Sequence, residues 1–460
     1  MKYIFLLISL FTFNFLQAQV TGVVKDAAGE PIPGANVFWM NTTNGVTTNE
    51  DGNFSIHKPA RSHMLVVSFI GFENDTIHVD KGNQQLDIVL REGVELSEVN
   101  VVTRKLGTMK LRTSVMNEDM ISSAELTRAA CCNLGESFVT NPSVDVSYSD
   151  AATGAKQIKL LGLSGTYVQM MTENIPNFRG AAAPYGLGYV PGPWMQSIQV
   201  SKGSSSVKNG YESITGQINV EFKKPQLPEA DWVSANLFAS STNRYEANAD
   251  ATVKLSKRWS TSLLAHYENE TKSHDSNDDG FVDIPRVEQY NVWNRWAYMG
   301  DHYVFQAGIK ALHETRNSGQ IAHGNTPSHD LYEIGIKTNR YEAFTKNAYI
   351  FDKEKNTNLA LILQGTLHNQ DANYGRKLYD VDQSNFYASL LFETELSKQH
   401  SLSAGLSFNY DGYDQNYRLT NQAEEGLTKK FVKESVPGAY VQYTFNLNDQ
   451  LMLMGGIRGD

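Results

Sequence analysis

The sequence predicts a mostly β chain with three parts: a small N-terminal β-sandwich, a mixed α+β domain, and part of a membrane β-barrel. Short strands separated by turn residues indicate the sandwich. Alternation between apolar and polar residues, clearest over 401–410, indicates strands with one face in lipid and the other in water. Short and long connections alternate along the same region, which is typical of outer-membrane barrels.

The composition limits the classes of function that the chain can have. With 460 residues it is too long for one ordinary core, so several domains are expected. The net charge of −10 argues against a nucleic-acid partner, which would need a basic face. The only two cysteines are adjacent, so the chain has no disulfide framework.

Residues 1–18 are predicted to form a secretory signal peptide. Lys2 precedes an apolar run from Tyr3 to Leu16, and cleavage is expected after Ala18. The alternative is a membrane anchor, but the apolar run is short for a helical span of about 20 residues.

Residues 19–92 are predicted to form the sandwich. Asn44-Gly45 and Asp51-Gly52 have the chemistry of tight turns between short strands. Asp51-Gly52 would also suit a calcium motif, but we prefer the hairpin turn. The segment resembles the carboxypeptidase regulatory-like domain that precedes many receptors of the Bacteroidetes type, and nothing in it indicates catalysis. The resemblance rests on three segments: Gly34–Val37, Thr48–Phe54 and Val67–Phe72.

Ile198–Pro225 is predicted to form a β-hairpin, because two apolar strands flank a turn rich in glycine and serine. The amino-acid sequence of this segment resembles the end of the plug domain of TonB-dependent outer-membrane receptors. Ile198–Gly203 stands for the family's strand of the type IEVLRGP, and Asn209–Val220 stands for its second segment, YGSGAIGGVINIITK. The resemblance implies a plug over residues 109–225 and a barrel over residues 226–460.

The rest of the plug-like region fits the same resemblance with two departures. Leu161 stands where the family's IRGL strand has arginine, and Glu173-Asn174 replaces its Asp-Gly turn. These departures weaken any transfer of substrate detail. A helix is also predicted over 122–139, with a serine as its N-cap.

The linker 93–108 carries a β-prone segment of acidic and apolar residues. In the family a similar segment is the TonB box, so the resemblance implies that it adds as a strand to the sheet of a TonB-type periplasmic protein. The alternative is an ordinary first strand of the plug. The segment comprises Glu95, Leu96, Ser97, Glu98, Val99, Asn100, Val101, Val102 and Thr103.

Residues 177–193 form an irregular segment rich in glycine, proline and aromatic residues. In the family, loops at the top of the plug reach the substrate. The resemblance therefore suggests four substrate contacts, with packing of the loop against the barrel wall as the alternative. These are Arg179, Tyr185, Tyr189 and Trp194.

Cys131-Cys132 has two interpretations. Thiolates bind soft metals such as Cu(I), and Met170-Met171 offers thioethers in the same domain. Adjacent cysteines on a helix point in different directions, however, so a pair of small buried side chains, or an oxidised vicinal pair, is the preferred interpretation.

Residues 226–460 contain about eleven alternating strands, which predicts a partial outer-membrane barrel. Long loops are expected near 271–290, 315–332, 370–383 and 411–433, on the extracellular side. Tryptophans near strand ends are expected at the membrane interfaces: Trp232, Trp259, Trp293 and Trp296. Plugged transporters need about 22 strands, and an open half-barrel would leave unpaired backbone groups in lipid. We therefore expect the sequence to be the first part of a longer receptor, C-terminally truncated.

The first long loop carries oxygen ligands at the spacing of an EF-hand-type calcium loop. Gly280 falls where such a loop turns sharply, but the glutamate of the twelfth position is missing, so weak binding is expected. The alternative is a solvated acidic loop. The candidate ligands are Asp275, Asn277, Asp279, the carbonyl of Phe281, and Asp283.

The resemblance implies TonB-dependent active import of a scarce substrate across the outer membrane of a Gram-negative cell. The expected substrate is a metal chelate such as a ferric siderophore, or a heavy metal such as copper. No enzyme is expected, because the sequence has no nucleophile elbow, H-E-x-x-H or phosphate loop. The expected partners are the TonB-type protein, outer-membrane lipid and the small-molecule substrate. No cofactor is required beyond a possible structural calcium. The alternatives are an oligosaccharide importer, a barrel-based surface adhesin or scaffold, and a substrate-sensing transducer.

Overall fold

The computed structural model describes most of the chain in two compact units, Met1–Val102 and Thr103–Asp460. Each unit is described by itself. The described residues are 19–26, 29–40, 42, 44–59, 63–69, 72, 75–79, 85–90, 108–110, 117–128, 132–139, 141–203, 206–225, 232–321, 331–420, 426–448 and 451–460.

The first unit is a pair of small β-sheets that enclose one apolar core. β1 (Gln19–Lys25) alternates exposed and buried residues and pairs with β4 (Asn53–His57) and β7 (Gln85–Val89). Its buried side chains pack with Trp39, which is fully buried. Gly52 has a φ of +73° in the turn before β4, which agrees with the predicted hairpin turn. The second sheet has the order β3 (Gly45–Thr47), β2 (Asn36–Trp39), β5 (Met64–Ser68), β6 (Asp75–His78).

The second unit contains an inner domain, defined as the described residues of 108–225, and an eleven-stranded sheet called the wall. The inner domain has a six-stranded and a three-stranded sheet. The larger sheet has the order β14 (Ile175–Pro176), β13 (Val168–Thr172), β16 (Gly216–Phe222), β15 (Met195–Lys202), β9 (Asn117–Ser122), β8 (Thr108–Lys110). The smaller sheet has the order β10 (Val144–Asp150), β11 (Ala155–Leu160), β12 (Leu163–Ser164).

The predicted hairpin within Ile198–Pro225 is the centre of the larger sheet. β15 and β16 pair antiparallel, and both strands bury almost all of their apolar side chains. β16 also pairs in parallel with β13, so it has a strand on each side. The hairpin is thus confirmed and forms the core of the inner domain.

The helix predicted over 122–139 is wrong in its length. Within the described residues of 122–139, only Ser123–Arg128 (α2) and a 3₁₀ turn at Leu134–Glu136 (η1) are helical. Asn133 has extended backbone and its side-chain oxygen accepts a hydrogen bond from Glu136 N, so it starts a new turn rather than continuing α2. Five further 3₁₀ turns are described: η2 (Gly165–Tyr167), η3 (Gly180–Ala182), η4 (Gly186–Tyr189), η5 (Gly192–Trp194) and η6 (Val207–Asn209).

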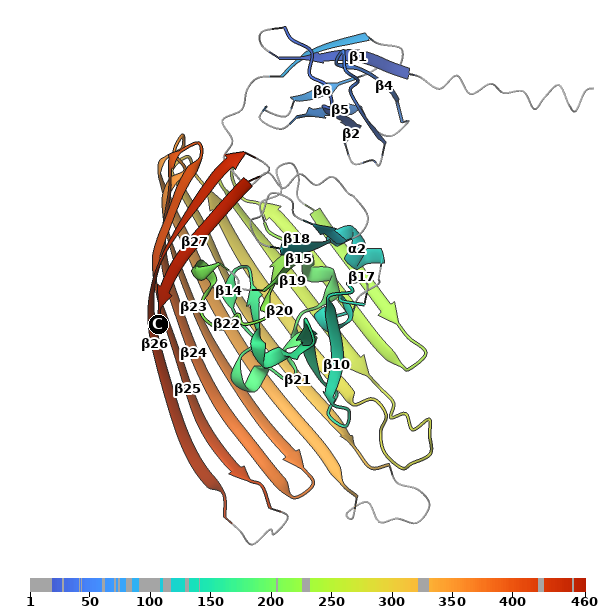
Figure 1. Ribbon diagram of the computed structural model, residues 1–460. Coiled ribbons are helices and arrows are strands. Elements are labelled where there is room, and N and C mark those ends of the chain that lie inside the picture. The colour runs from blue at the N-terminus through green and yellow to red at the C-terminus, as the bar shows by residue number, and fades with distance from the viewer. Residues whose placement is uncertain are drawn as a thin grey trace, which may run out of the picture. The chain divides into compact units, whose positions relative to one another are not determined.

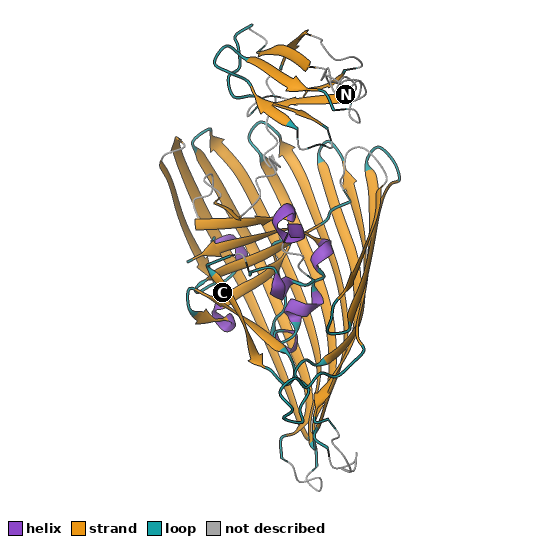
Figure 2. Ribbon diagram, turned by 90° about the vertical axis from the view of Figure 1, so that its right-hand side faces the viewer, coloured by secondary structure: helices purple, strands orange, loops and turns teal. Residues whose placement is uncertain are grey.

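The wall is a single antiparallel sheet in which each strand pairs with its neighbours in sequence. Figures 1 and 2 show the sheet curving around the inner domain, which lies against its concave face. Among the described residues, no helix is long and apolar enough to cross a bilayer. The strands are β17 (Trp232–Ala239), β18 (Arg244–Lys254), β19 (Trp259–Glu270), β20 (Arg286–Met299), β21 (Tyr303–Gly319), β22 (Glu333–Asp352), β23 (Thr357–Tyr374), β24 (Lys377–Ser397), β25 (His400–Arg418), β26 (Thr428–Asn448) and β27 (Leu451–Gly459).

The two-sided pattern of the wall strands is confirmed. On β25, Leu406 and Phe408 are exposed, whereas Ser403 and Asn409, which point to the other face of the strand, are buried. Trp293 does not belong to an interfacial girdle, because it shares its face of β20 with buried Arg295 and packs against the inner domain. Trp259 and Trp296 are exposed, and the side chain of Trp232 lies outside the described residues.

One predicted long loop is instead a tight hairpin. Residues 370–383 form the ends of β23 and β24, which are joined by Gly375 and Arg376. Their polar side chains suggested a loop, but backbone pairing continues to Tyr374 and Lys377. Where a strand extends beyond the lipid, its outer face does not need apolar side chains, so the strand can continue with polar residues on both faces.

Candidate substrate pocket and the inner domain–wall interface

The turn between β13 and β14 anchors the inner domain to the wall through Glu173. Glu173 and Asn174 both have positive φ (51° and 62°), as in a tight hairpin turn. Glu173 Oε1 lies 2.5 Å from Arg295 Nη2 on β20, and Glu173 Oε2 lies 3.7 Å from Lys346 Nζ on β22. Burial opposes ionisation of Glu173, but Arg295 and Lys346 outweigh it and lower the pKa of its carboxyl.

Asn177 adds a second buried link directly after β14. Arg340 Nη2 donates to Asn177 Oδ1 at 2.6 Å, and Asn177 Nδ2 donates to Glu342 Oε2 at 2.9 Å. Glu342 also lies 3.5 Å from Lys310 Nζ. Charged wall residues are therefore satisfied by the inner domain, as buried charges must be.

Arg179 makes a third link beside η3. Its guanidinium lies 2.6 Å from Glu212 Oε1 of the inner domain and 3.4 Å from Asp411 Oδ2 on β25. Burial would lower the pKa of Arg179, but the two carboxylates outweigh this effect and raise it. Its side chain is one-fifth exposed, so this predicted contact keeps some surface free.

The other three predicted substrate contacts are buried. Tyr189 and Trp194 have no exposed surface, and Tyr185 is nearly covered. Tyr189 O accepts a hydrogen bond from Asn291 Nδ2 at 3.0 Å, and the Trp194 ring centroid lies 6.3 Å from that of Trp293. This burial supports the alternative of packing against the wall for Tyr189 and Trp194. Substrate contact by any of the four residues stays a prediction.

A pocket of about 350 Å³ lies between the inner domain and the ends of β18 to β21 that carry the long loops. Tyr185 lines it, together with Tyr148 from β10 and Phe238 from β17. Ile284 and Pro285 of the first long loop complete the lining. The charged lining residues are Glu136, Lys156, Arg244, Glu268, Glu270, Glu314 and Arg316.

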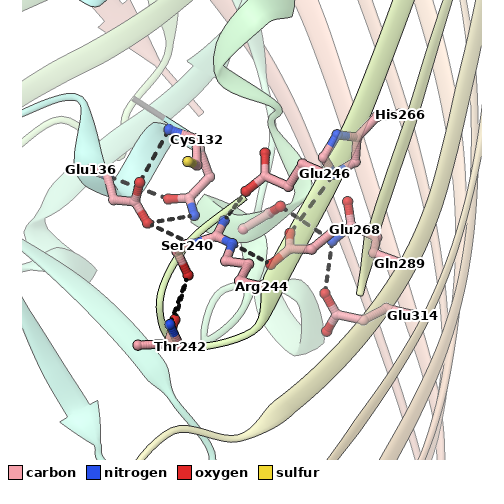
Figure 3. A network of polar contacts seen from close by, with 12 residues as sticks. Cys132, Glu136, Ser240, Thr242, Arg244, Glu246, His266, Glu268, Gln289 and Glu314 are labelled. Carbon is pink, nitrogen blue, oxygen red and sulfur yellow. Dashed lines mark hydrogen bonds and ion pairs between the residues drawn. The ribbon is translucent and has the colours of Figure 1, made fainter. Parts of the chain in front are cut away.

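Arg244 is the centre of the polar network in this pocket (Figure 3). Its guanidinium lies 3.0 Å from Glu136 of the inner domain, and 2.7 and 2.9 Å from Glu246 and Glu268 of the wall. Three carboxylates from three segments therefore converge on one cation. Among the other lining residues, Arg316 pairs with Glu314 at 3.0 Å.

Cys132 lies in the same network with a buried thiol (Figure 3). Burial and the nearby Glu246 raise the pKa of this thiol, which keeps it protonated. This state agrees with the interpretation of Cys132 as a small buried side chain. Cys131 lies outside the described residues.

The candidate calcium loop is folded by its own acidic side chains. Asp275 accepts hydrogen bonds from the backbone N–H groups of Asp279 and Gly280, and Asp283 Oδ2 accepts from Ser276 N at 2.7 Å. Within the described ranges, no group of three His, Cys, Asp or Glu side chains is placed to hold a metal ion. Calcium binding, with Asn277 and the Phe281 carbonyl as further ligands, stays a prediction.

Sequence reasoning missed the charged pocket residues, and the candidate TonB box Glu95–Thr103 lies outside the described residues. A usable signal was present. Arg244 and Glu246 are two residues apart, as are Glu314 and Arg316, so each pair lies on one face of its strand. Charged residues that face inward, close to the loop that follows or precedes a strand, indicate a hydrated and functional lumen.

An α+β domain enclosed by a curved wall of long antiparallel strands is a fold that the chain shares with solved outer-membrane receptors. Residues 110–217 match the TonB-dependent Receptor Plug Domain, and residues 20–102 match the CarboxypepD_reg-like domain. The chain therefore carries the plug of a TonB-dependent receptor, a family of outer-membrane proteins. These families are receptor modules and not enzymes, as the sequence predicted.

The chain is 28% identical to the TonB-dependent receptor SusC of Bacteroides thetaiotaomicron over 245 residues, which are 50% of this chain and 24% of SusC. The chain therefore spans about a quarter of that relative's length.

Solved structures confirm the predicted fold class. The alcaligin outer-membrane receptor FauA from Bordetella pertussis superimposes with a TM-score of 0.61 at 15% identity, over 79% of this chain and 60% of that one. The copper transporter OprC gives a TM-score of 0.61 at 13% identity, over 74% and 53%.

Proposed function

We propose that the chain forms the gate and the first wall strands of a receptor that imports a scarce substrate by using energy from a TonB-type partner. The observation that carries this proposal is the inner domain, which fills the concave side of the wall and is tied to it by the buried Glu173–Arg295 pair. A domain held by polar links in a lumen suits a gate, because water can replace those links when it moves.

The substrate class proposed from the sequence is a metal chelate such as a ferric siderophore, or a heavy metal such as copper. Structural relatives named as an alcaligin receptor and a copper transporter share the fold at 15% and 13% identity, which supports the architecture and not the cargo. An oligosaccharide is the second candidate, because Tyr148 presents an exposed aromatic ring among polar groups of the pocket.

A surface adhesin is disfavoured by the same inner domain. Adhesion needs exposed loops on a stable barrel, and it does not need a domain that fills the lumen. The polar links of Asn177 and Arg179 to the wall would have no purpose in such a protein.

The test is deletion of Glu95–Thr103 in cells that depend on the receptor. Uptake should be lost while binding at the cell surface stays unchanged, because the segment serves only to recruit the partner strand. Growth is measured under iron limitation, under copper limitation, and with oligosaccharides as the carbon source. Surface binding is measured with the substrate that supports growth.

A matched variant replaces Glu95–Thr103 with nine Gly and Ser residues and should behave like the deletion. Loss of binding together with uptake would show instead that the segment is a structural strand of the plug. Full uptake by both variants would contradict the proposed coupling.

A further inference from the structure

Most of the charged residues that line the pocket form ion pairs within the protein. Arg244 contacts three carboxylates, and Arg316 pairs with Glu314. Lys156 and Glu270 remain, and neither has an oppositely charged partner within 4.0 Å in the described part of the chain. The pocket therefore holds one ammonium group and one carboxyl group that form no direct ion pair among the described residues.

Lys156 is held on β11 with its ammonium group in the pocket. Its backbone N–H donates to Pro184 O at 3.1 Å, and its Nζ lies 5.5 Å from the ring centroid of Tyr148. Lys156 and Tyr148 are directly opposite each other in the β10–β11 pair, so the strand register fixes this arrangement. Tyr148 is 60% exposed and leaves the approach to the ammonium open.

The surroundings of Lys156 disfavour its charge in the absence of a ligand. Burial lowers the pKa of its ammonium, and Arg244 and Arg316 lower it further, while Glu136 and Glu268 act in the opposite sense. A carboxylate of a ligand placed beside Lys156 would give its ammonium a direct partner in a charge-assisted hydrogen bond.

We propose that Lys156 binds an anionic group of the substrate, a carboxylate, while Glu270 accepts a hydrogen bond from a donor on the same molecule. The inference rests on the proposed function, because it assigns the substrate chemistry of that receptor's pocket. Carboxylates of this kind occur on uronic-acid sugars and on carboxylate chelates of iron. Tyr148, which lies beside Lys156, offers a flat apolar face for an uncharged part of the ligand.

The test measures binding to the receptor in isolated outer membranes, with no energy source present. Digalacturonate is compared with a neutral galactose disaccharide, and ferric citrate with a ferric hydroxamate chelate that carries no carboxylate. The receptor should bind the acidic member of at least one pair more tightly than the other member. The pair that shows this preference identifies the source of the carboxylate.

Lys156→Met should weaken binding of the preferred acidic probe by roughly tenfold or more. Lys156→Arg should retain most of the affinity because it keeps the charge. Lys159→Met is the matched control on the same strand and should bind like the wild type, since Lys159 does not line the pocket. Thermal melting checks that all three variants fold.

Three results would each overturn the proposal: equal affinity for acidic and neutral probes, no binding of any acidic probe, or unchanged binding by Lys156→Met. Because these measurements need no transport, a failed deletion test of Glu95–Thr103 would leave them unaffected. Conversely, TonB-dependent uptake of a neutral substrate would keep the proposed function and remove this inference.

Discussion

At the scale of single residues, the interface between the inner domain and the wall depends on buried charges with several partners each. Glu173 faces Arg295 and Lys346, and its turn is fixed by the positive φ of two consecutive residues. Removing one member of such a group leaves the others buried without compensation, which costs more than the contact itself stabilises.

Glu173→Gln should therefore destabilise the docked inner domain by about 3–5 kcal/mol, because Arg295 loses its carboxylate while it stays buried. The measurement is thermal unfolding of the purified receptor, with limited proteolysis of the inner domain as a second readout. Asp301→Asn, which breaks the exposed Arg258–Asp301 pair, is the control and should leave both readouts unchanged.

The charge of Glu173 also predicts that the stability of the receptor depends on pH. The pKa of Glu173 is lowered in the folded state, so its contribution to stability is present above the ordinary glutamate pKa of about 4.3 and is lost as the pH falls through the folded value. The difference in melting temperature between wild type and Glu173→Gln should be constant near neutral pH and should shrink below about pH 4. A difference that does not change with pH would contradict the assignment of the charge.

Single residues were the hardest level to predict from the sequence. The inward position of Trp293 follows from strand parity, since it is two residues from buried Arg295, but its place near a strand end suggested a girdle. The pairing of Arg244 with Glu136 could not be foreseen, because it joins residues 108 positions apart through the docking of two domains. No local pattern contains that information.

At the scale of elements, the β15–β16 hairpin is the part that the sequence predicts best. Its apolar alternation and glycine-rich turn are local signals, and the structure follows them. Two other predictions were wrong where local signals were ambiguous. The segment 122–139 has helical composition but is interrupted at Asn133, and the polar residues of 370–383 continue two strands.

Gly216 is the residue of this hairpin that tolerates no side chain. Its φ is +146°, and a Cβ would overlap Ser201 O and lie 2.7 Å from Leu160 Cδ2. Gly216→Ala should therefore lower the free energy of unfolding by about 1–3 kcal/mol through backbone strain. The steric overlap of the new Cβ should lower it further. Gly365→Ala on β23 is the control, because nothing lies within 4 Å of its Cβ position. An equal effect of both substitutions on thermal unfolding would show that the strained backbone is not the cause.

At the scale of the whole molecule, the proposed gate depends on how the inner domain is held against the wall. The sequence predicted a plug-like domain followed by about eleven strands. The domain was indicated by its sequence motifs and the strands by their apolar–polar alternation, and both are local features of the chain. It could not predict the pocket, whose lining comes from residues between Cys132 and Arg316. The substrate chemistry therefore depends on the docking of the two parts, because Lys156 of the inner domain and the charged residues of the wall line the same pocket.

Movement of the inner domain can be tested by measuring uptake with this domain tethered to the wall. Ser206 Oγ, just before η6, donates to Gln442 Oε1 of β26 at 2.7 Å, so cysteines at these two positions can be joined by a short cleavable thiol cross-linker. Cys131 and Cys132 are replaced by serine in this background, and the single Ser206→Cys variant is the control. Cross-linking should abolish uptake without reducing surface binding, and cleavage of the linker with a reductant should restore uptake. Undiminished uptake by fully cross-linked receptor would contradict the claim that the inner domain must move for the substrate to pass.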